Sequence, residues 1–138
     1  MKTAIVILNY NDYENTERYI KEIENYEVLN KILIVDNCSP QNDYEKLKKF
    51  ESEKIEIIKT EKNGGYSYGN NFGLKYLENK QEEYDYIIIS NTDISVTEQA
   101  INRCVQFLEK NNKAAIAAPK MFYPSGEARR SSRKQRTY

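Results

Sequence analysis

The chain has 138 residues, a length that fits one domain with a single core. Its 21 Lys and Arg residues balance 21 Asp and Glu residues, and the net charge of zero argues against bulk attraction to nucleic acid or anionic lipid. There is no run of about 18 apolar residues, so no transmembrane segment is expected. Histidine is absent, which excludes histidine triads and histidine metal sites and leaves carboxylates and amides as candidate ligands.

The first residues of the chain and its two cysteines bear on the cellular compartment in which the protein is expected. The short apolar run within residues 1–8 is followed by the polar residues 9–12 instead of a small-residue cleavage site, so no signal peptide is expected. Cys38 and Cys104 lack the spacing of metal ligands. We therefore expect reduced thiols and a cytoplasmic location.

Apolar runs alternate with helical periodicities along the chain. In chain order the pattern predicts a strand at 2–8, a helix with apolar residues at 19–26, a strand at 31–35, a short helix at 44–50, a strand at 55–58, a helix at 67–77, a strand at 84–89, a helix at 97–111 and a strand at 114–118. Strands separated by helices predict parallel pairing with right-handed crossovers. Because the strands are near-continuous apolar runs, we expect helices on both faces of the sheet.

The predicted organisation is one α/β domain over residues 1–122, followed by a basic tail at 123–138 with no apolar periodicity. Asn11 or Asp12 is expected to cap the first helix through its side-chain oxygen. The turn after the first strand contains no glycine, and no Gly-Lys-Ser/Thr run occurs. The chain therefore lacks the signatures of dinucleotide-binding and triphosphate-binding loops.

Two of the predicted strands end in acidic and amide side chains. Asp36 and Asn37 follow the second strand, and Asn91-Thr92-Asp93 follow the fourth. Ligands of open α/β sheets bind outside the carboxyl ends of the strands. We therefore expect the acidic ends of two neighbouring strands to line one crevice. Such a crevice suits a nucleoside diphosphate, whose charge Mg²⁺ or Mn²⁺ neutralises with the help of one or two protein carboxylates.

A glycine-rich stretch at 63–73 holds four of the five glycines. Gly64 and Gly65 would let the backbone approach a ligand closely, and two further glycines, one helical turn apart, would let the next helix pack tightly on the sheet. Asn70 and Asn71 offer amides near the start of that helix, where free N–H groups favour anions. Tight packing alone is the alternative explanation.

The other motifs also have structural alternatives. Tyr10, at the end of the first strand, would stack on a planar base or pack over the first helix. The Asp36-Asn37 pair would bond to the edge of a uracil or thymine ring or form an Asx turn. The 91–93 segment would bind metal or form the turn that leads into the next helix.

Together these motifs resemble those of the inverting glycosyltransferases of family two, and most of all the rhamnosyltransferase-like branch. The resemblance covers nearly the whole chain and rests on the stretches ILNYN (7–11), IVDNCS (34–39), NGGY (63–66), GNNFG (69–73), SNTDI (90–94) and APKMFYPSG (118–126). It implies a truncated GT-A fold, in which a Rossmann-like, mostly parallel sheet is flanked by helices on both faces.

The resemblance also implies roles for individual residues. The residues implied to bind a nucleotide-sugar are Asn9, Tyr10, Asp36, Asn37, Asn63, Gly64, Gly65, Asn71, Asn91 and Thr92. Tyr10 would stack on the base, and Asp36 and Asn37 would sit at the base and ribose. Asp93 matches the metal-binding Asp of the family's Asp-x-Asp-type motif and would hold Mg²⁺ or Mn²⁺, while Asn91 stands in place of the motif's first Asp.

The reaction that the resemblance implies is transfer of a sugar from a UDP- or dTDP-sugar to an acceptor hydroxyl with inversion. The family's catalytic base lies further along, so residues 123–138 are expected to lead toward a missing acceptor-binding part. No catalytic residue is assigned within this chain, and the segment alone is expected to be inactive. For the longer parent, the resemblance implies a glycan or lipid-linked acceptor at the inner membrane face.

Two other functions are compatible with an α/β sheet. A non-catalytic, flavodoxin-like module for nucleotide binding or protein interaction would bind nucleotide without metal, or would bind only a protein. A nucleotidyltransferase would be expected to carry an early glycine-rich loop with basic residues, and the first turn has neither.

Overall fold

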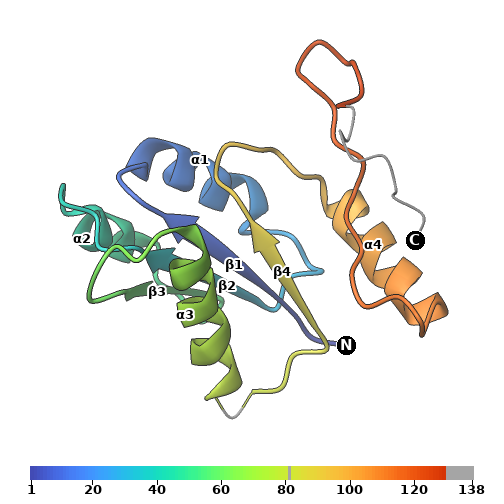
Figure 1. Cartoon of the computed structure of the whole chain (residues 1–138), viewed down its shortest axis with the longest axis horizontal. Helices are drawn as coiled ribbons and strands as arrows, with labels where there is room; N and C mark the ends of the chain where they lie inside the picture. The colour runs from blue at the N-terminus through green and yellow to red at the C-terminus, as the bar shows by residue number, and fades with distance from the viewer. Residues whose placement is uncertain (81, 130–138) are drawn as a thin grey trace, which may run out of the picture. The chain divides into compact units, whose positions relative to one another are not determined.

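The structure is a computed structural model that describes residues 1–80 and 82–129. Four parallel strands form a sheet in the order β3-β2-β1-β4 (Figure 1). The elements are β1 (Thr3–Asn9), α1 (Tyr13–Ile23), β2 (Lys31–Asp36), α2 (Asp43–Leu47), the 3-10 helix η1 (Lys48–Phe50), β3 (Ile55–Lys59), α3 (Tyr66–Glu78), β4 (Tyr86–Ser90) and α4 (Glu98–Lys110).

The connections place helices on both faces of the sheet. From β1 the chain proceeds through α1 to β2 and through α2 to β3, moving in one direction across the sheet. It then crosses back over β2 and β1, through α3, to reach β4. Because crossovers between parallel strands are right-handed, α1 and α3 lie on opposite faces (Figure 1). The predicted α/β fold with a parallel sheet covered on both faces is confirmed.

The helix α3 packs very closely against one face of the sheet. Its enclosed apolar residues are Ala4, Val6, Leu33, Val35 and Leu77. A Cβ atom on Gly73 would lie 2.8 Å from Val6 Cγ1 and 2.9 Å from Val35 Cγ2, so only glycine fits between α3 and the sheet at this position. The close helix packing expected from the glycines is therefore confirmed.

The opposite face of the sheet is built from isoleucines. Ile5, Ile7, Ile32 and Ile34 alternate with the residues of the α3 face along β1 and β2, and all four are fully enclosed. The inward residues of α1, Tyr19, Ile20 and Ile23, are fully enclosed as well. Burying one such side chain contributes about 1.5–3 kcal/mol, so these two faces hold the sheet and its helices together.

The chain divides into two compact units, Met1–Glu98 and Gln99–Tyr138, and each is described by itself. In the second unit residues 114–118 do not form a strand, so the strand predicted there is wrong. Its alanines offer little apolar area to bury, and Ile116 is 86% exposed.

The beginning of the predicted tail is folded into a turn. Phe122 and Ala128 form an antiparallel bridge, and Tyr123 N donates to Glu127 O at 2.8 Å. Gly126 has φ +85°, a left-handed conformation that glycine adopts without strain. The rest of the predicted tail, residues 130–138, lies outside the described residues. Within residues 1–80 and 82–129, none of the helices combines the length and apolar character that crossing a membrane requires.

Candidate functional site

The direction in which the chain crosses the sheet reverses between β1 and β4. These two strands are neighbours, yet the chain leaves β1 in one direction and returns to β4 over the opposite face of the sheet. In open α/β sheets, ligands bind outside the carboxyl ends of the strands at such a point. The residues that follow β1 and β4 are therefore the first candidates for function.

The segment after β4 carries a carboxylate, that of Asp93. Thr92 is buried, and its Oγ1 donates to Asp12 Oδ2 at 2.7 Å, which links the loops after β4 and β1. Asn91 and Asp93, on either side of Thr92, are exposed. The Asp93 carboxylate has no hydrogen bond or ion pair with any residue of the described part of the chain. Asp93 is thus free to take a ligand at the β1–β4 position.

Asp12 does not act as the expected side-chain cap of α1. It occupies the N-cap position, but no side-chain cap bond forms. Its Oδ2 is taken by Thr92 Oγ1 and its Oδ1 by Asn15 Nδ2, at 2.8 Å. The capping prediction, for Asn11 as for Asp12, is wrong because a donor 80 positions away in sequence competes for the carboxylate.

A buried polar cluster fills the space behind the ends of β1 and β2. Asn9, which is fully enclosed, donates from Nδ2 to Asp36 Oδ1 at 2.8 Å and to Asp43 Oδ2 at 3.1 Å. Its Oδ1 accepts from Thr16 Oγ1 at 2.7 Å. Ser39 donates from its hydroxyl to Asp36 Oδ1 at 2.6 Å and from its backbone N–H to Asp36 Oδ2 at 3.1 Å. We name Asn9, Thr16, Asp36, Ser39 and Asp43 the Asn9 cluster.

The strand order contradicts one part of the sequence interpretation. The strands that end in Asp36 and near Asp93 are β2 and β4, and they are not neighbours, because β1 lies between them. Asp36 also has no exposed surface. Sequence patterns are local and carry no information on which strands become adjacent. The predicted contact of Asp36 with a nucleotide stays a prediction.

The glycine-rich loop is anchored to the end of β2. Asn37 is 2% exposed, and its Nδ2 donates to Asn63 Oδ1 at 3.0 Å and to Gly65 O at 3.1 Å. The Asn37 Oδ1 atom accepts from Thr60 Oγ1 at 3.2 Å. Gly65 has φ +86° and leads directly into α3, a conformation that favours glycine. Asn37 thus fixes the loop that contains Asn63 and the two glycines.

The start of α3 is open to a ligand. No side chain caps it, so its first backbone N–H groups are available to acceptors. Tyr66 is 55% exposed, and Asn71 is exposed. Asn70 is 4% exposed, and its Oδ1 is a buried atom without a hydrogen-bond partner, whereas its Nδ2 donates to Tyr66 O at 3.0 Å.

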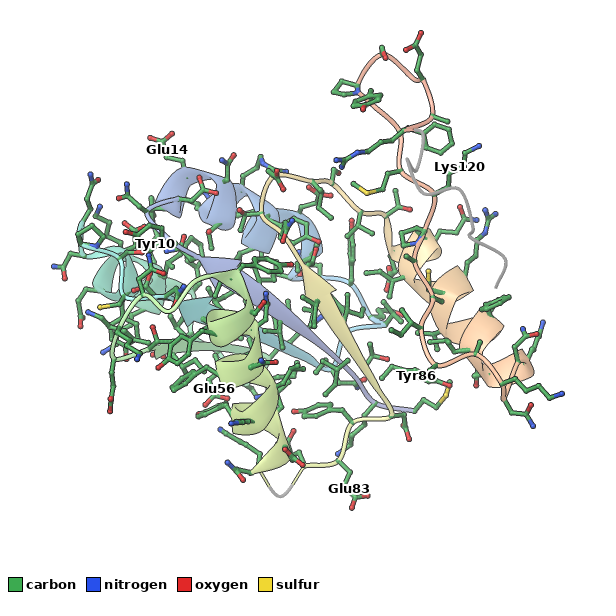
Figure 2. The ribbon with its side chains drawn as sticks, viewed as in Figure 1. Tyr10, Glu14, Glu56, Glu83, Tyr86 and Lys120 are labelled. Atoms are coloured by element: carbon green, nitrogen blue, oxygen red, sulfur yellow. The ribbon has the colours of Figure 1, made fainter. Side chains whose placement is uncertain are left out.

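Tyr10 stands at the carboxyl end of β1, where Figure 2 labels it. Tyr10 is 47% exposed, so it is not buried against the first helix. Asn11, next to it, has φ +50° and donates its backbone N–H to Ser39 Oγ at 2.8 Å. The ring is therefore held at the sheet edge by a backbone that the Asn9 cluster fixes.

The described residues contain no group of three or more His, Cys, Asp or Glu residues that would enclose a metal ion. This donor set fits a Mg²⁺ or Mn²⁺ ion that takes one protein carboxylate and completes its shell with water and phosphate oxygens. Asp93 would be that carboxylate if the chain binds such an ion. The arrangement does not fit a site formed by protein ligands alone.

A pocket of about 210 Å³ lies beside the loop after β1 and is lined by Asn11, Asp12, Tyr13, Glu14, Gln41, Asp43 and Lys46. None of the residues predicted to bind a nucleotide-sugar lines it. Three carboxylates against one ammonium group repel a diphosphate. This pocket is therefore not the candidate site.

The structure adds residues that the sequence patterns did not single out. Asp43 lies in the second helix of the chain, seven positions beyond Asp36, where no motif marked it. Thr16 belongs to a helix whose polar residues looked ordinary, and Ser39 ended the 34–39 motif without a role of its own. Arg18, on α1, contacts the segment after β4. Only the apolar face of α1 carried a signal in the sequence, so these polar contacts were not predictable from it.

The fold defines a class, the α/β domains with a parallel sheet and a strand order that favours ligand binding outside the carboxyl ends of β1 and β4. Residues 4–138 match the family described as Glycosyl transferase family 2. The chain belongs to this family. It is 26% identical over 121 residues to the dolichol-phosphate mannosyltransferase of Pyrococcus furiosus, a match that covers 86% of this chain and 33% of that protein.

Solved structures share the fold. The mannosyltransferase PcManGT from Pyrobaculum calidifontis, in complex with GDP-Man and Mn²⁺, superposes with a TM-score of 0.63 at 12% identity and covers 78% of this chain and 32% of its own. TarS of S. aureus superposes with a TM-score of 0.58 at 21% identity and covers 81% of this chain and 33% of its own. The GT-A-like fold is thereby confirmed, and the chain spans about a third of the length of these proteins.

Proposed function

We propose that the chain is the nucleotide-sugar-binding part of an inverting, metal-assisted glycosyltransferase, similar to the rhamnosyltransferase-like branch, with a UDP- or dTDP-sugar as donor. The observation that carries this proposal is Asp93, an exposed carboxylate without a partner in the described residues, at the point where the strand order favours a ligand crevice. A carboxylate left unpaired at such a position is available to a cation.

The residues around this position suit the parts of a nucleotide. The exposed ring of Tyr10 offers a flat surface for a base. The uncapped start of α3, with the Gly64-Gly65 backbone before it, offers N–H groups to phosphate oxygens. Asn91 and Thr92 would complete the donor site beside Asp93.

Mg²⁺ or Mn²⁺ bound by Asp93 would neutralise the charge that develops on the departing diphosphate. The relative PcManGT carries Mn²⁺ and GDP-Man, which supports a metal here. Asn9 and Asp36 would shape the site from behind, through the Asn9 cluster. Direct contact between Asp36 and the base or ribose would require the Ser39 turn to move, because both Asp36 oxygens are already bonded.

An acceptor hydroxyl would attack the anomeric carbon from the face opposite the diphosphate, so the configuration would invert. We place the general base, a carboxylate, in an acceptor-binding part and expect the present chain alone to show no sugar transfer. The acceptor is proposed to be a glycan or a lipid-linked glycan at the cytoplasmic face of a membrane. The name of the Pyrococcus furiosus relative, which refers to dolichol phosphate, supports a lipid-linked acceptor.

Calorimetric titration of UDP, dTDP and GDP, each with Mn²⁺ and with EDTA, tests the proposal. We expect at least one nucleotide to bind with Mn²⁺ and to bind at least tenfold more weakly with EDTA. Asp93→Ala should abolish this metal dependence. Glu83→Ala is the matched control, because Glu83 is exposed, precedes β4 and lies at the opposite end of the sheet (Figure 2).

Two results would count against the proposal. Binding that is equally tight in EDTA would favour a metal-independent nucleotide-binding module of flavodoxin-like shape. Binding of no nucleotide by a chain that is folded by circular dichroism would exclude the donor site.

A further inference from the structure

One edge of α1 is bonded to the loop that carries Asp93. Arg18, Glu22 and Tyr26 are spaced four residues apart, so they lie along one side of the helix and its C-terminal extension. All three bind residues 92–96, which follow β4 and are more than 65 positions away in sequence. Together with the bond from Thr92 to Asp12, the side of α1 therefore holds the loop that presents Asp93.

Arg18 bonds to the backbone on both sides of Asp93. Its Nη2 donates to Thr92 O at 2.6 Å and to Ile94 O at 2.9 Å. Its Nη1 donates to Glu22 Oε2 at 3.0 Å, which fixes the guanidinium in place. A planar guanidinium donates in several fixed directions at once, which a lysine ammonium on a flexible stem does not reproduce.

Glu22 and Tyr26 hold the next residues of the loop. Glu22 Oε1 accepts from Val96 N at 3.1 Å and from the Ser95 hydroxyl. The Tyr26 hydroxyl donates to Val96 O at 2.9 Å. Burial raises the pKa of Tyr26, and the nearby charges of Glu22 and Glu98 raise it further, so its hydroxyl remains a donor at neutral and mildly alkaline pH.

These contacts leave the Asp93 side chain untouched. Arg18 binds the carbonyl groups of the residues before and after Asp93, and Asp12 binds the Thr92 hydroxyl. The carboxylate itself is exposed and has no partner in the described part of the chain. The backbone is thus fixed while the ligand atom stays free, which is the arrangement that a preorganised metal ligand requires.

We propose that Arg18 is a positioning residue for the metal site, because it fixes the backbone carbonyls of Thr92 and Ile94 so that the Asp93 carboxylate points at the cation of the bound donor. This inference rests on the proposed function. Residues that support metal ligands in this way typically change metal affinity by about 10-fold to 100-fold when they are replaced. Arg18 touches neither the nucleotide nor the cation in this proposal.

The test compares Arg18→Lys and Arg18→Met with the wild-type chain and with Lys21→Met. Lys21 is an exposed residue of the same helix that pairs with Glu17 at 3.2 Å, away from the loop. Free Mn²⁺ is followed by electron paramagnetic resonance during titration at a fixed, saturating UDP concentration. Nucleotide affinity is measured separately at saturating Mn²⁺, and amide hydrogen exchange is followed over residues 91–96.

Both Arg18 variants should need about 10-fold more Mn²⁺ for half-saturation and should exchange faster over residues 91–96. At saturating Mn²⁺ their UDP affinity should return to that of the wild type, which general damage to the fold would not allow. Lys21→Met should match the wild type in all three measurements. Because the Arg18 side chain is 46% exposed, both variants are expected to fold.

Mn²⁺ titrations of both Arg18 variants that superpose on the wild-type curve would overturn the inference and leave the proposed function standing. A UDP defect that persists at saturating Mn²⁺ would also overturn it, because Arg18 would then act on the nucleotide or the whole fold. A wild-type chain that binds UDP without any Mn²⁺ dependence would overturn the metal-assisted function and the inference with it.

Discussion

Asn9 joins two buried carboxylates with a single side-chain amide. Its Nδ2 donates to Asp36 at 2.8 Å and to Asp43 at 3.1 Å, and both acids are almost completely enclosed. Burying a carboxylate costs desolvation free energy, and hydrogen bonds from donors offset that cost. When the donors are removed, the cost remains and nothing offsets it. The loss of stability on removing Asn9 therefore comes mainly from the two buried carboxylates left without this donor, and less from the strength of the bonds themselves.

Asn9→Ala is expected to lower the free energy of unfolding by about 3 kcal/mol, because it leaves Asp36 and Asp43 short of a donor in an enclosed site. Urea denaturation followed by circular dichroism measures the change. Asn25→Ala, at an exposed position just after α1, should change stability by less than about 0.5 kcal/mol. A loss below about 1 kcal/mol in Asn9→Ala would show that water replaces the amide easily.

The sequence pattern indicated that Asn9 and Asp36 are functionally important, but it did not indicate which residues they bond to. Both were predicted as contacts of the nucleotide-sugar, and that prediction is still open to test. The structure shows their bonds to Thr16, Ser39 and Asp43. Exposure of a side chain depends on everything that packs around it, so residue type and spacing at a strand end do not reveal it.

Among the elements, α3 is held by two kinds of contact. Its glycine face packs directly on the valines of β1 and β2. At its other end Glu56, on β3, accepts bonds from the Tyr76 hydroxyl and from Lys80 Nζ at 2.7 Å (Figure 2). Burial opposes ionisation of Glu56, yet the bonds from Lys80 and Tyr76 prevail and lower its pKa.

Because the pKa of Glu56 is lowered on folding, its contribution to stability is present above the unfolded pKa of about 4.3 and is lost as the pH falls through the folded value. Glu56→Gln should therefore be less stable than the wild type at pH 7, by less than about 1 kcal/mol since the group is partly exposed. The difference should shrink below about pH 4.

Urea denaturation of both chains between pH 3 and pH 7 measures this dependence. Glu53→Gln, which replaces an exposed acid in the loop before β3, serves as the control. A stability difference that stays constant over the whole range would show that packing, and not the charge of Glu56, connects α3 to β3.

For the whole molecule, ligand binding and folding are linked. A ligand that binds only the folded chain stabilises it by about 2.7 kcal/mol when its concentration is 100 times the dissociation constant. For a domain of this size we expect UDP with Mn²⁺ to raise the unfolding midpoint by on the order of 10 °C. Differential scanning fluorimetry measures the shift, and EDTA should remove it.

Asp93→Ala should unfold at the same temperature as the wild type without ligand, because its carboxylate has no partner in the described residues. It should not respond to Mn²⁺ in the presence of UDP. A midpoint that rises equally with Mn²⁺ in both chains would place the metal elsewhere.

The amino-acid sequence by itself determined the alternation of strands and helices and the parallel sheet, because apolar periodicity and turn residues act over a few neighbouring positions. It also predicted a strand at 114–118, and these residues form no strand in the structure. The local sequence pattern is sufficient to predict the class of fold. Which strands pair with one another depends on the assembled sheet.

Only the tertiary structure decided the strand order, the enclosure of Asp36 and the lack of a partner for Asp93 among residues 1–80 and 82–129. The partners concerned are distant in sequence, 27 positions for Asn9 and Asp36 and 74 for Arg18 and Thr92. Whether a carboxylate at a strand end is bonded within the protein or left free for a ligand depends on which distant donors reach it. That is settled by the packing of α1 and α2 against the sheet edge, and not by the residues next to it in the chain.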